Sequence, residues 1–269
     1  YWSECIIMEF LAGNRIRGLD SEKLSTTSIA TITLDNQMNQ PSTSSGTTLT
    51  KSLTIGDNSQ RILIVSAGAY NASPSITSIT YGGTALSLLK DVNGSPAGAH
   101  LYYMLNPPVG TADVVVTWSA TAGQRGMGAY CFYNVSQSTP DGATHSILQT
   151  SGTTTILGVL TPTVTGSMII DSMMWLAGTQ GSTSETNGWC NFINNGSPDR
   201  NQGSQYKLNP TIGSANNMQY TTSSGGGYSW VGAEIKAGFD SIDVPDGSIF
   251  YATDTNKSYV LYNGSWNEL

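Results

Sequence analysis

The chain has 269 residues and a formal net charge of −7 at pH 7, and only 11% of its residues are charged. A nucleic-acid partner requires clustered Lys and Arg to neutralise phosphates, whereas the 11 basic residues are scattered, so this class of partner is excluded. No apolar run approaches the roughly 20 residues that a membrane-spanning helix needs, and the sequence predicts no membrane span.

Uncharged polar residues dominate the composition. Hydrophobic residues make up only 38% of the chain, and Ser, Thr, Asn and Gly fill the difference. These residues hydrogen-bond locally and favour turns and the solvent faces of strands over helices. The composition is therefore typical of an exposed β protein, and we expect it on a virion surface or in an extracellular location.

Residues 1–10 form the most apolar segment near either end of the chain. The side chains that fall on one side of an extended strand are Trp2, Ile6, Met8 and Phe10. We predict an arm that adds to an edge strand of another copy, since a sheet edge accepts an apolar strand. The alternative is an ordinary strand of its own domain.

Residues 26–238 are predicted to form an antiparallel, jelly-roll-like β-sandwich. Short β-branched and apolar runs alternate with clusters of Gly, Pro, Ser and Asn, which is typical of all-β sandwiches. The predicted strands are Ser28–Asp35, Thr47–Ile55, Arg61–Tyr70, Ile76–Tyr81, Ala85–Val92, His100–Leu105, Ala112–Ser119, Gly126–Val135, Thr144–Gln149, Thr153–Leu160, Met168–Leu176, Gln205–Leu208 and Met218–Ala237. The polar stretch from Gly178 to Gly203 is predicted to be a long exposed loop.

Residues 239–269 are predicted to form a small β-hairpin module. Two short runs, Ser248–Ala252 and Ser258–Tyr262, flank a polar turn, and Asn263-Gly264 turns the chain again. An isolated hairpin is marginally stable in water. We therefore expect it to dock on residues 1–25, which would make the central sandwich an insertion into one small module.

The end of the chain resembles a short hairpin module found in tail-fibre and other structural proteins of bacteriophages and archaeal viruses. The residues that carry this resemblance are Pro245, Gly247, Phe250, Thr253, Asp254, Thr255, Tyr259, Tyr262, Gly264 and Trp266. In those proteins a segment similar to Gly13–Gly18 lies a short way before the hairpin, whereas here residues 19–244 separate the two.

The central part resembles jelly-roll domains of phage, viral and secreted prokaryotic surface proteins. The segments that carry this resemblance are Ile79–Thr84, Leu101–Tyr103 with Asn106–Pro108, and Tyr130–Val135. Together the resemblances imply a non-enzymatic coat, decoration or tail-fibre subunit that assembles with itself. Other virion proteins and host surface glycans are further expected partners, and no cofactor is implied. The alternatives are a carbohydrate-binding or adhesion module and a glycan-cleaving enzyme.

Glycan cleavage would require two carboxylates placed across one sugar bond, and the candidates are Asp171 and Glu234. Asp171 alternates with apolar residues, so we expect it within an apolar face, where burial raises the pKa of a carboxyl unless the carboxyl is paired. Glu234 shares its side of a strand with Trp230 and Lys236, which indicates a solvent face with a local salt bridge. We therefore expect structural carboxylates rather than catalytic ones.

No spacing of metal ligands or of a catalytic triad is present around the two histidines, His100 and His145. The three cysteines, Cys5, Cys131 and Cys190, are predicted to be free thiols, with a Cys131–Cys190 disulfide as the alternative. Catalytic, cofactor-binding and metal-binding residues are accordingly not expected.

Two kinds of surface contact remain as predictions. Trp189 lies in the polar stretch with nothing beside it in sequence to pack on, so it is a candidate glycan contact. Six Asn-x-Ser sequons are candidate glycosylation sites, namely Asn71, Asn93, Asn134, Asn195, Asn256 and Asn263.

Overall fold

The computed structural model describes residues 15–18, 28–70, 75–94, 97–150, 152–193, 199–240, 249–262 and 265–269. Their regular structure is β-strand throughout, and the strands pair antiparallel with the exception of β1 with β22. The predicted all-β, antiparallel sandwich fold is confirmed. The chain divides into two compact units, one formed by residues 1–29 with 239–269 and the other by residues 30–238.

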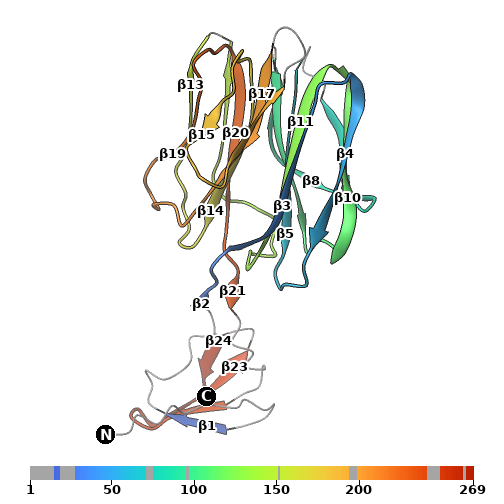
Figure 1. The fold of residues 1–269 in the computed structure, drawn as a ribbon. Helices are drawn as coiled ribbons and strands as arrows, with labels where there is room; N and C mark the ends of the chain where they lie inside the picture. Colours follow the sequence, from blue (N-terminus) through green and yellow to red (C-terminus); the bar gives the residue numbers. More distant parts are fainter. Residues whose placement is uncertain are drawn as a thin grey trace, which may run out of the picture. The chain divides into compact units, whose positions relative to one another are not determined.

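Four sheets make up the described part of residues 30–238 (Figure 1). The first outer sheet contains β4 (Gly46–Ile55), β10 (Gly110–Ala122), β6 (Ile76–Tyr81) and β7 (Thr84–Ala85). The first inner sheet contains β3 (Thr33–Ser42), β11 (Gln124–Tyr133), β5 (Ile62–Tyr70), β9 (Ala97–Leu105) and β8 (Ser87–Val92). Each sheet is given in its spatial strand order.

The other two sheets follow in sequence. The second inner sheet contains β12 (Thr144–Gln149), β20 (Tyr228–Ile235), β14 (Met168–Trp175), β17 (Arg200–Ser204) and β16 (Trp189–Ile193), and β18 (Tyr206–Leu208) also pairs with β14. The second outer sheet contains β13 (Thr155–Leu160), β19 (Asn216–Thr221) and β15 (Ser182–Thr183).

A separate apolar core lies between each pair of neighbouring sheets. Trp118 and Val65 belong to the core of the first outer and inner sheets, and Ile64 and Ile170 belong to the core between the two inner sheets. Trp175 belongs to the core of the second inner and outer sheets. The four sheets therefore form two sandwiches that pack face to face through their inner sheets, where the sequence alone indicates a single sandwich.

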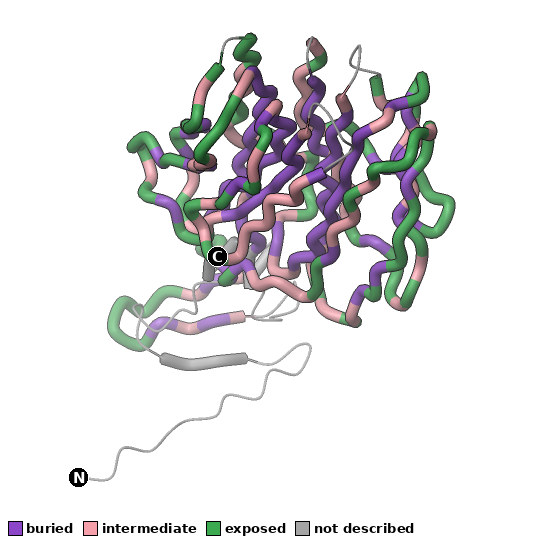
Figure 2. The backbone as a smooth tube through the Cα atoms, turned by 45° about the horizontal axis from the view of Figure 1, so that its top comes forward, coloured by how far each residue is buried: buried purple, intermediate pink, exposed green. Residues whose placement is uncertain are grey.

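Burial patterns follow from this layering (Figure 2). The inner strands β14 and β20 are buried at every position, because an apolar layer covers both of their faces. The outer strand β13 instead alternates between exposed and buried positions along most of its length, as expected when one face meets water. The longest continuous apolar runs of the sequence are thus strands of the two inner sheets, where both faces of a strand are covered.

The stretch from Gly178 to Gly203 is not the exposed loop that the sequence predicts. It contains β15 and β16 and most of β17. Asn201 and Gln202 on β17 are 0% exposed, and the Asn201 amide donates to the carbonyl oxygens of Ala177 and Thr179. Buried polar side chains are tolerated where their hydrogen bonds are made, so polar composition here does not mean exposure.

The terminal unit contains a small sheet built from both ends of the chain. β1 (Arg15–Gly18) pairs in parallel with β22 (Ile249–Ala252), which continues antiparallel to β23 (Lys257–Tyr262) and then β24 (Ser265–Glu268). β2 (Ser28–Ile29) pairs with β21 (Phe239–Asp240). Phe250, Ala252 and Tyr259 form the apolar core of this unit, and Trp266 packs against it.

Arg125 closes one end of the first sandwich. This side chain is 5% exposed, and its guanidinium donates to the carbonyl oxygens of Ser44, Gly46, Thr48 and Ala122 at 2.7–3.0 Å. The acceptors belong to the β3–β4 connection, to β4 and to the end of β10. A single buried cation thus joins the two sheets of the sandwich through their backbones.

Replacing Arg125 by Met should lower the free energy of unfolding by about 2–4 kcal/mol, because several buried carbonyl groups lose their donor. Urea unfolding measures the change. Lys51→Met is the control, since Lys51 is exposed and donates to one carbonyl, that of Asn39, and it should shift stability by less than about 0.5 kcal/mol. Equal effects of the two substitutions would show that Arg125 does not hold the sheets together.

Candidate functional site

The Asp171 carboxylate is the centre of a buried polar network in the second sandwich. One of its oxygens accepts from the Gln205 backbone N–H at 2.8 Å and from the Tyr220 hydroxyl at 2.6 Å. The other accepts from Trp230 Nε1 at 2.9 Å and from Gln205 Nε2 at 3.3 Å. Hydrogen bonds to this one side chain thereby connect strands β14, β19 and β20 and the β17–β18 connection.

This network lies entirely inside the protein. Asp171 and Tyr220 are both 0% exposed, and Asp171 faces the same core as Ile169 and Met173. Burial raises the pKa of the Asp171 carboxyl to about 7, despite four donors that favour the charged form. The predicted position in an apolar face, with a raised pKa, is confirmed.

Glu234, on β20, is a second buried acceptor. Its carboxylate accepts the backbone N–H groups of Ala143, Thr163 and Val164 at 2.9–3.0 Å, and the Thr163 hydroxyl at 3.0 Å. Burial by itself raises the pKa of this carboxyl, but the backbone donors outweigh it and hold the pKa below its usual value.

The expected solvent position of Glu234 is wrong. The side chain is 1% exposed, because the segments that carry Ala143 and Thr163 cover this side of β20. Lys236 forms its ion pair with Asp141 at 2.5 Å instead. Asp171 and Glu234 therefore act as internal acceptors that fix strands and loops, and neither carboxylate is presented to a substrate.

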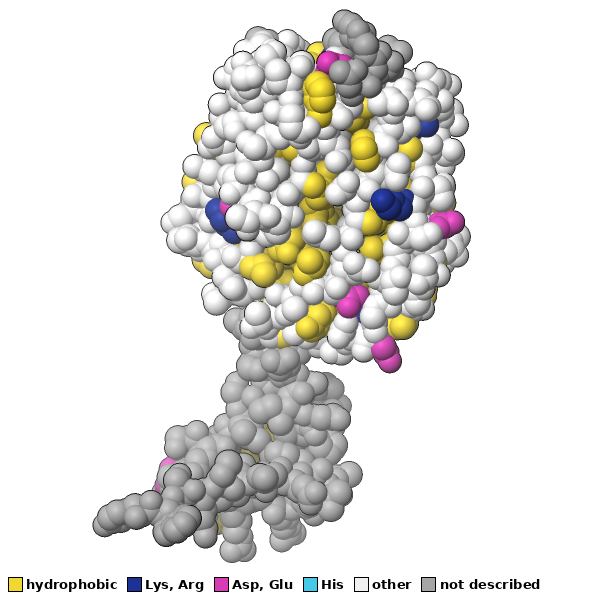
Figure 3. All heavy atoms as spheres, viewed as in Figure 1, with side chains coloured by type: hydrophobic (Ala, Val, Ile, Leu, Met, Phe, Trp, Pro, Cys, Tyr) yellow, Lys and Arg dark blue, Asp and Glu magenta, His cyan; other side chains and the backbone are white. Residues whose placement is uncertain are grey.

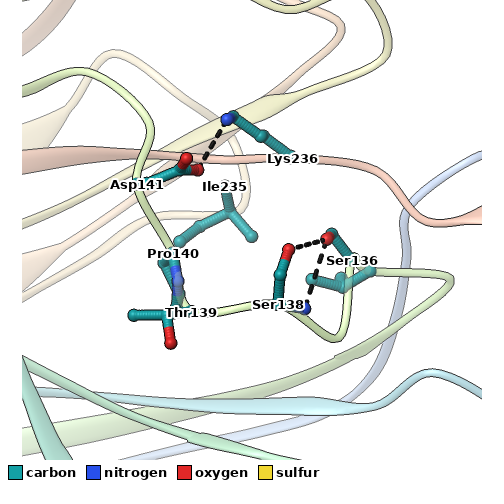
Figure 4. A pocket seen from close by; sticks show the side chains of 8 residues that line it. Ser136, Ser138, Thr139, Pro140, Asp141, Ile235 and Lys236 are labelled. Atoms are coloured by element: carbon teal, nitrogen blue, oxygen red, sulfur yellow. Dashed lines mark hydrogen bonds and ion pairs between the residues drawn. The ribbon is translucent and has the colours of Figure 1, made fainter.

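A small pocket lies where the chain passes from the first sandwich to the second (Figure 4). The Lys236–Asp141 ion pair and a 2.8 Å hydrogen bond between the hydroxyls of Ser136 and Ser138 lie at its wall. Its lining residues are Val135, Ser136, Ser138, Thr139, Pro140, Asp141, Ile235 and Lys236. A volume of about 10 Å³ is the space for one water molecule, and is too small for a sugar.

Trp189 has packing partners that its sequence neighbours do not reveal. It lies on β16 of the second inner sheet, is half-buried, and packs against the core between the inner sheets. A Cβ atom added to Gly128 of the first inner sheet would stand 2.0 Å from Trp189 Cζ2. The ring therefore lies against the neighbouring sheet, and a glycan contact through its remaining surface stays a prediction.

His100 is buried and His145 is exposed, and neither of the described cysteines is in a disulfide. His100 is 1% exposed, and burial lowers the pKa of its imidazole to about 4 against a smaller opposing effect of Asp91. His145 Nδ1 lies 2.9 Å from the Val159 carbonyl oxygen. Cys131 and Cys190 are free thiols, as predicted, and burial raises the pKa of both to about 12.

Three of the six sequons have a described asparagine. Asn93 and Asn256 are exposed, whereas Asn134 is half-buried and donates from its amide to the Thr31 carbonyl oxygen at 3.0 Å. Because they are exposed, Asn93 and Asn256 are the better acceptors of a glycan. The predicted sites that lie outside the described residues are Cys5, Asn71, Asn195, Asn263 and the arm residues Trp2, Ile6, Met8 and Phe10.

Sequence reasoning found Asp171 but missed its partners Gln205 and Tyr220. A carboxylate within an apolar strand face requires donors from facing strands. Tyr220 alternates with Met218 on β19, and both are buried. A Tyr or Trp at an inward-facing position was therefore the feature of the sequence that could have indicated a donor for Asp171. The sequence does not reveal which strands face each other, and the pairing therefore could not be assigned.

Within the described ranges, no group of three or more His, Cys, Asp and Glu side chains is arranged to hold a metal ion. The same part of the chain contains no helix that is long and apolar enough to cross a membrane. Comparison of the chain with protein-family models, curated proteins and solved structures found no match.

Asp171→Asn should flatten the pH dependence of stability. Folding raises the pKa of this carboxyl, so its stabilising contribution is complete below the unfolded pKa of about 4 and is lost as the pH rises through about 7. The loss across this window is on the order of 4 kcal/mol, and urea unfolding between these pH values measures it. Asp57→Asn, at an exposed position, should keep the wild-type slope; an unchanged slope in Asp171→Asn would contradict the assignment.

Glu234→Gln should act with the opposite sign. Folding lowers the pKa of this carboxyl, so its contribution is present above the unfolded pKa and is lost as the pH falls. We expect the variant to lose about 2–3 kcal/mol at pH 7, because an amide cannot accept all of the former bonds, and to be less sensitive to acid. Glu185→Gln, which breaks the partly exposed pair with Lys207, should cost less than about 1 kcal/mol. Equal losses would refute the role of Glu234.

Proposed function

We propose that the chain is a non-enzymatic structural subunit of a virion or extracellular assembly, of the coat, decoration or tail-fibre kind, that works by self-assembly and surface display. The observation that carries this proposal is the terminal sheet, in which strands from both ends of the chain share one small core. The pairing of β1 with the hairpin supports the resemblance to the viral module, in which a segment similar to Gly13–Gly18 lies a short way before the hairpin.

The described motif residues lie in the core or in the turn of that unit. Phe250 and Tyr259 are buried, and the Phe250 and Trp266 rings lie 6.0 Å apart. Thr253–Asn256 form the turn between β22 and β23, where Asn256 has a φ of 56°, a left-handed conformation that Asn adopts more readily than most residues. The motif therefore encodes a turn and a core, which supports a folding module rather than a catalytic one.

The outer face of the first sandwich supports surface display. Hydroxyls pair across its strands, with Thr54 and Thr111 at 2.8 Å and Ser52 bonded to Asp113 at 2.5 Å. On the side of the molecule seen in Figure 3, charged side chains are few. A sheet face of paired hydroxyl groups stays hydrated without strong charge, as suits a protein displayed to water.

We also propose a jelly-roll-like plan for the sandwiches. In the first sandwich the chain passes from the inner β3 to the outer β4, back to the inner β5 and out to β6, and it returns through β9, β10 and β11 in the same alternating way. The first and last strands, β3 and β11, are neighbours. This alternation between two antiparallel sheets is the feature that supports the assignment.

The proposed partner is another copy of the chain, contacted through residues 1–10, with other virion proteins or host surface glycans as further partners. Burying three or four of the apolar arm side chains is worth on the order of 5–10 kcal/mol before ordering costs. An edge strand of a neighbouring copy would satisfy both the side chains and the backbone of such an arm.

Deleting residues 1–10 should leave a folded, soluble monomer that no longer assembles, as judged by electron microscopy and sedimentation. Replacing Trp2, Ile6, Met8 and Phe10 together by Ser should have the same effect with the arm length kept. Glu4→Gln with Glu9→Gln is the matched control and should assemble as the wild type does. Normal assembly of the truncated chain, or its failure to fold, would overturn the role of the arm.

A further inference from the structure

The two sandwiches share one strand order. The first inner sheet runs β3-β11-β5-β9-β8 and the second runs β12-β20-β14-β17-β16, so each strand has a counterpart at the same place. The outer sheets correspond as well, with β4-β10-β6 matched by β13-β19-β15. β17 and the short β18 pair with successive parts of β14. Together they are the counterpart of the longer β9, which pairs with β5 along its whole length.

Backbone pairing separates the same two halves. Each of these four sheets contains only strands that precede residue 134 or only strands that follow residue 143. Residues 134–143 connect the halves, and the bridge of Val135 with Ala237 lies at this junction. What joins the halves over the rest of their length is therefore contact made by side chains between the inner sheets, through packing and hydrogen bonds.

The packing between the inner sheets has approximate two-fold symmetry. β11 packs on β17 and its counterpart β20 packs on β9, while β3 meets β16 and β12 meets β8. β5 packs on its own counterpart, β14. Reciprocal contacts of this kind are those of an isologous interface, in which a strand at the axis meets its own copy.

Equivalent residues of β5 and β14 also agree with a two-fold axis between these strands. Ile64 pairs with Tyr103 in the first inner sheet, and Ile170 pairs with Tyr206 at the same place in the second. Two residues further along β5 and β14 lie Ser66 and Ser172, and Ser66 donates to the Ser172 hydroxyl oxygen at 2.7 Å with both residues 0% exposed. A residue on a two-fold axis touches its own counterpart, as these serines do.

We infer that residues 30–238 are two domains of one strand plan, docked through their inner sheets like the halves of a dimer. The surface of each inner sheet is thus an interaction surface, and its partner is the other domain of the same chain.

The two surfaces have become specific for one another. Gly128 of the first sheet receives the Trp189 ring, and a Cβ atom at Gly68 would stand 3.1 Å from Met174 Cβ. By strand register the counterpart of Gly128 is Val231, and that of Gly68 is Met174 itself. Two copies of the second inner sheet would place bulky side chains where the first sheet has glycines, so the interface fits unlike domains and disfavours a like pair.

Hydrogen exchange of the full chain, followed by mass spectrometry of strand-length peptides, tests this inference with two matched substitutions. In Gly158→Ala the new Cβ stands 2.1 Å from Trp230 Cε2 within the second domain, and in Gly128→Ala it stands 2.0 Å from Trp189 Cζ2 of the other domain. Local opening of a domain determines the exchange of its protected amides.

For Gly158→Ala we expect exchange in β13, β14, β19 and β20 to accelerate at least about tenfold, with β4 and β10 close to wild type. For Gly128→Ala we expect acceleration in both domains, because each loses its docked partner. Ser172→Ala, a milder change that keeps the packing, should accelerate both domains by about fivefold, the worth of one hydrogen bond. Equal acceleration of both domains in Gly158→Ala, or one-sided acceleration in Gly128→Ala and Ser172→Ala, would overturn the inference.

Discussion

The contact between the two inner sheets is the constraint on which the rest of residues 30–238 depends. A central strand of a sheet that is covered on both faces cannot leave its side chains in water, so β5 is buried along nearly its whole length and β14 along all of it. Close approach of the sheets requires small residues such as Gly68 and Gly128 opposite larger ones. The outer sheets are then the layers in which alternation of apolar and hydroxyl side chains is possible.

The layers on the other side of each inner sheet enclose unusual polar chemistry. Side chains such as Asp171, Glu234 and Arg125 are enclosed by neighbouring layers, and each is satisfied largely by backbone groups or by Tyr and Trp donors. Burial raises the pKa of one carboxyl, whereas backbone donors lower the pKa of the other. Their contributions to stability therefore oppose one another as the pH changes, and both connect strands and loops that the apolar cores alone would leave less fixed.

Much of the fold can be predicted from the sequence, and the limits have physical causes. The Ile76–Tyr81 strand is found with its predicted bounds, and the run from residue 61 to residue 70 is a strand with only its first residue missing, because β-branched runs bounded by turn residues carry a local signal. The division into two sandwiches carries no local signal, since a buried strand looks the same whichever sheet covers it. Polar residues at buried positions, such as Gln202 and Glu234, were predicted to be exposed because their hydrogen-bond partners lie far away in sequence.

A disulfide between Ser66→Cys and Ser172→Cys tests the docking of the inner sheets most directly. The hydroxyl oxygens of these serines lie 2.7 Å apart, and a disulfide forms only where two Cβ atoms are within about 4.5 Å of each other. Peptide mapping of the oxidised, folded double variant should show an intramolecular link between positions 66 and 172, with Cys131 and Cys190 unlinked. A folded variant in which the two new thiols stay reduced, or link only between chains, would contradict the face-to-face packing of the two sandwiches.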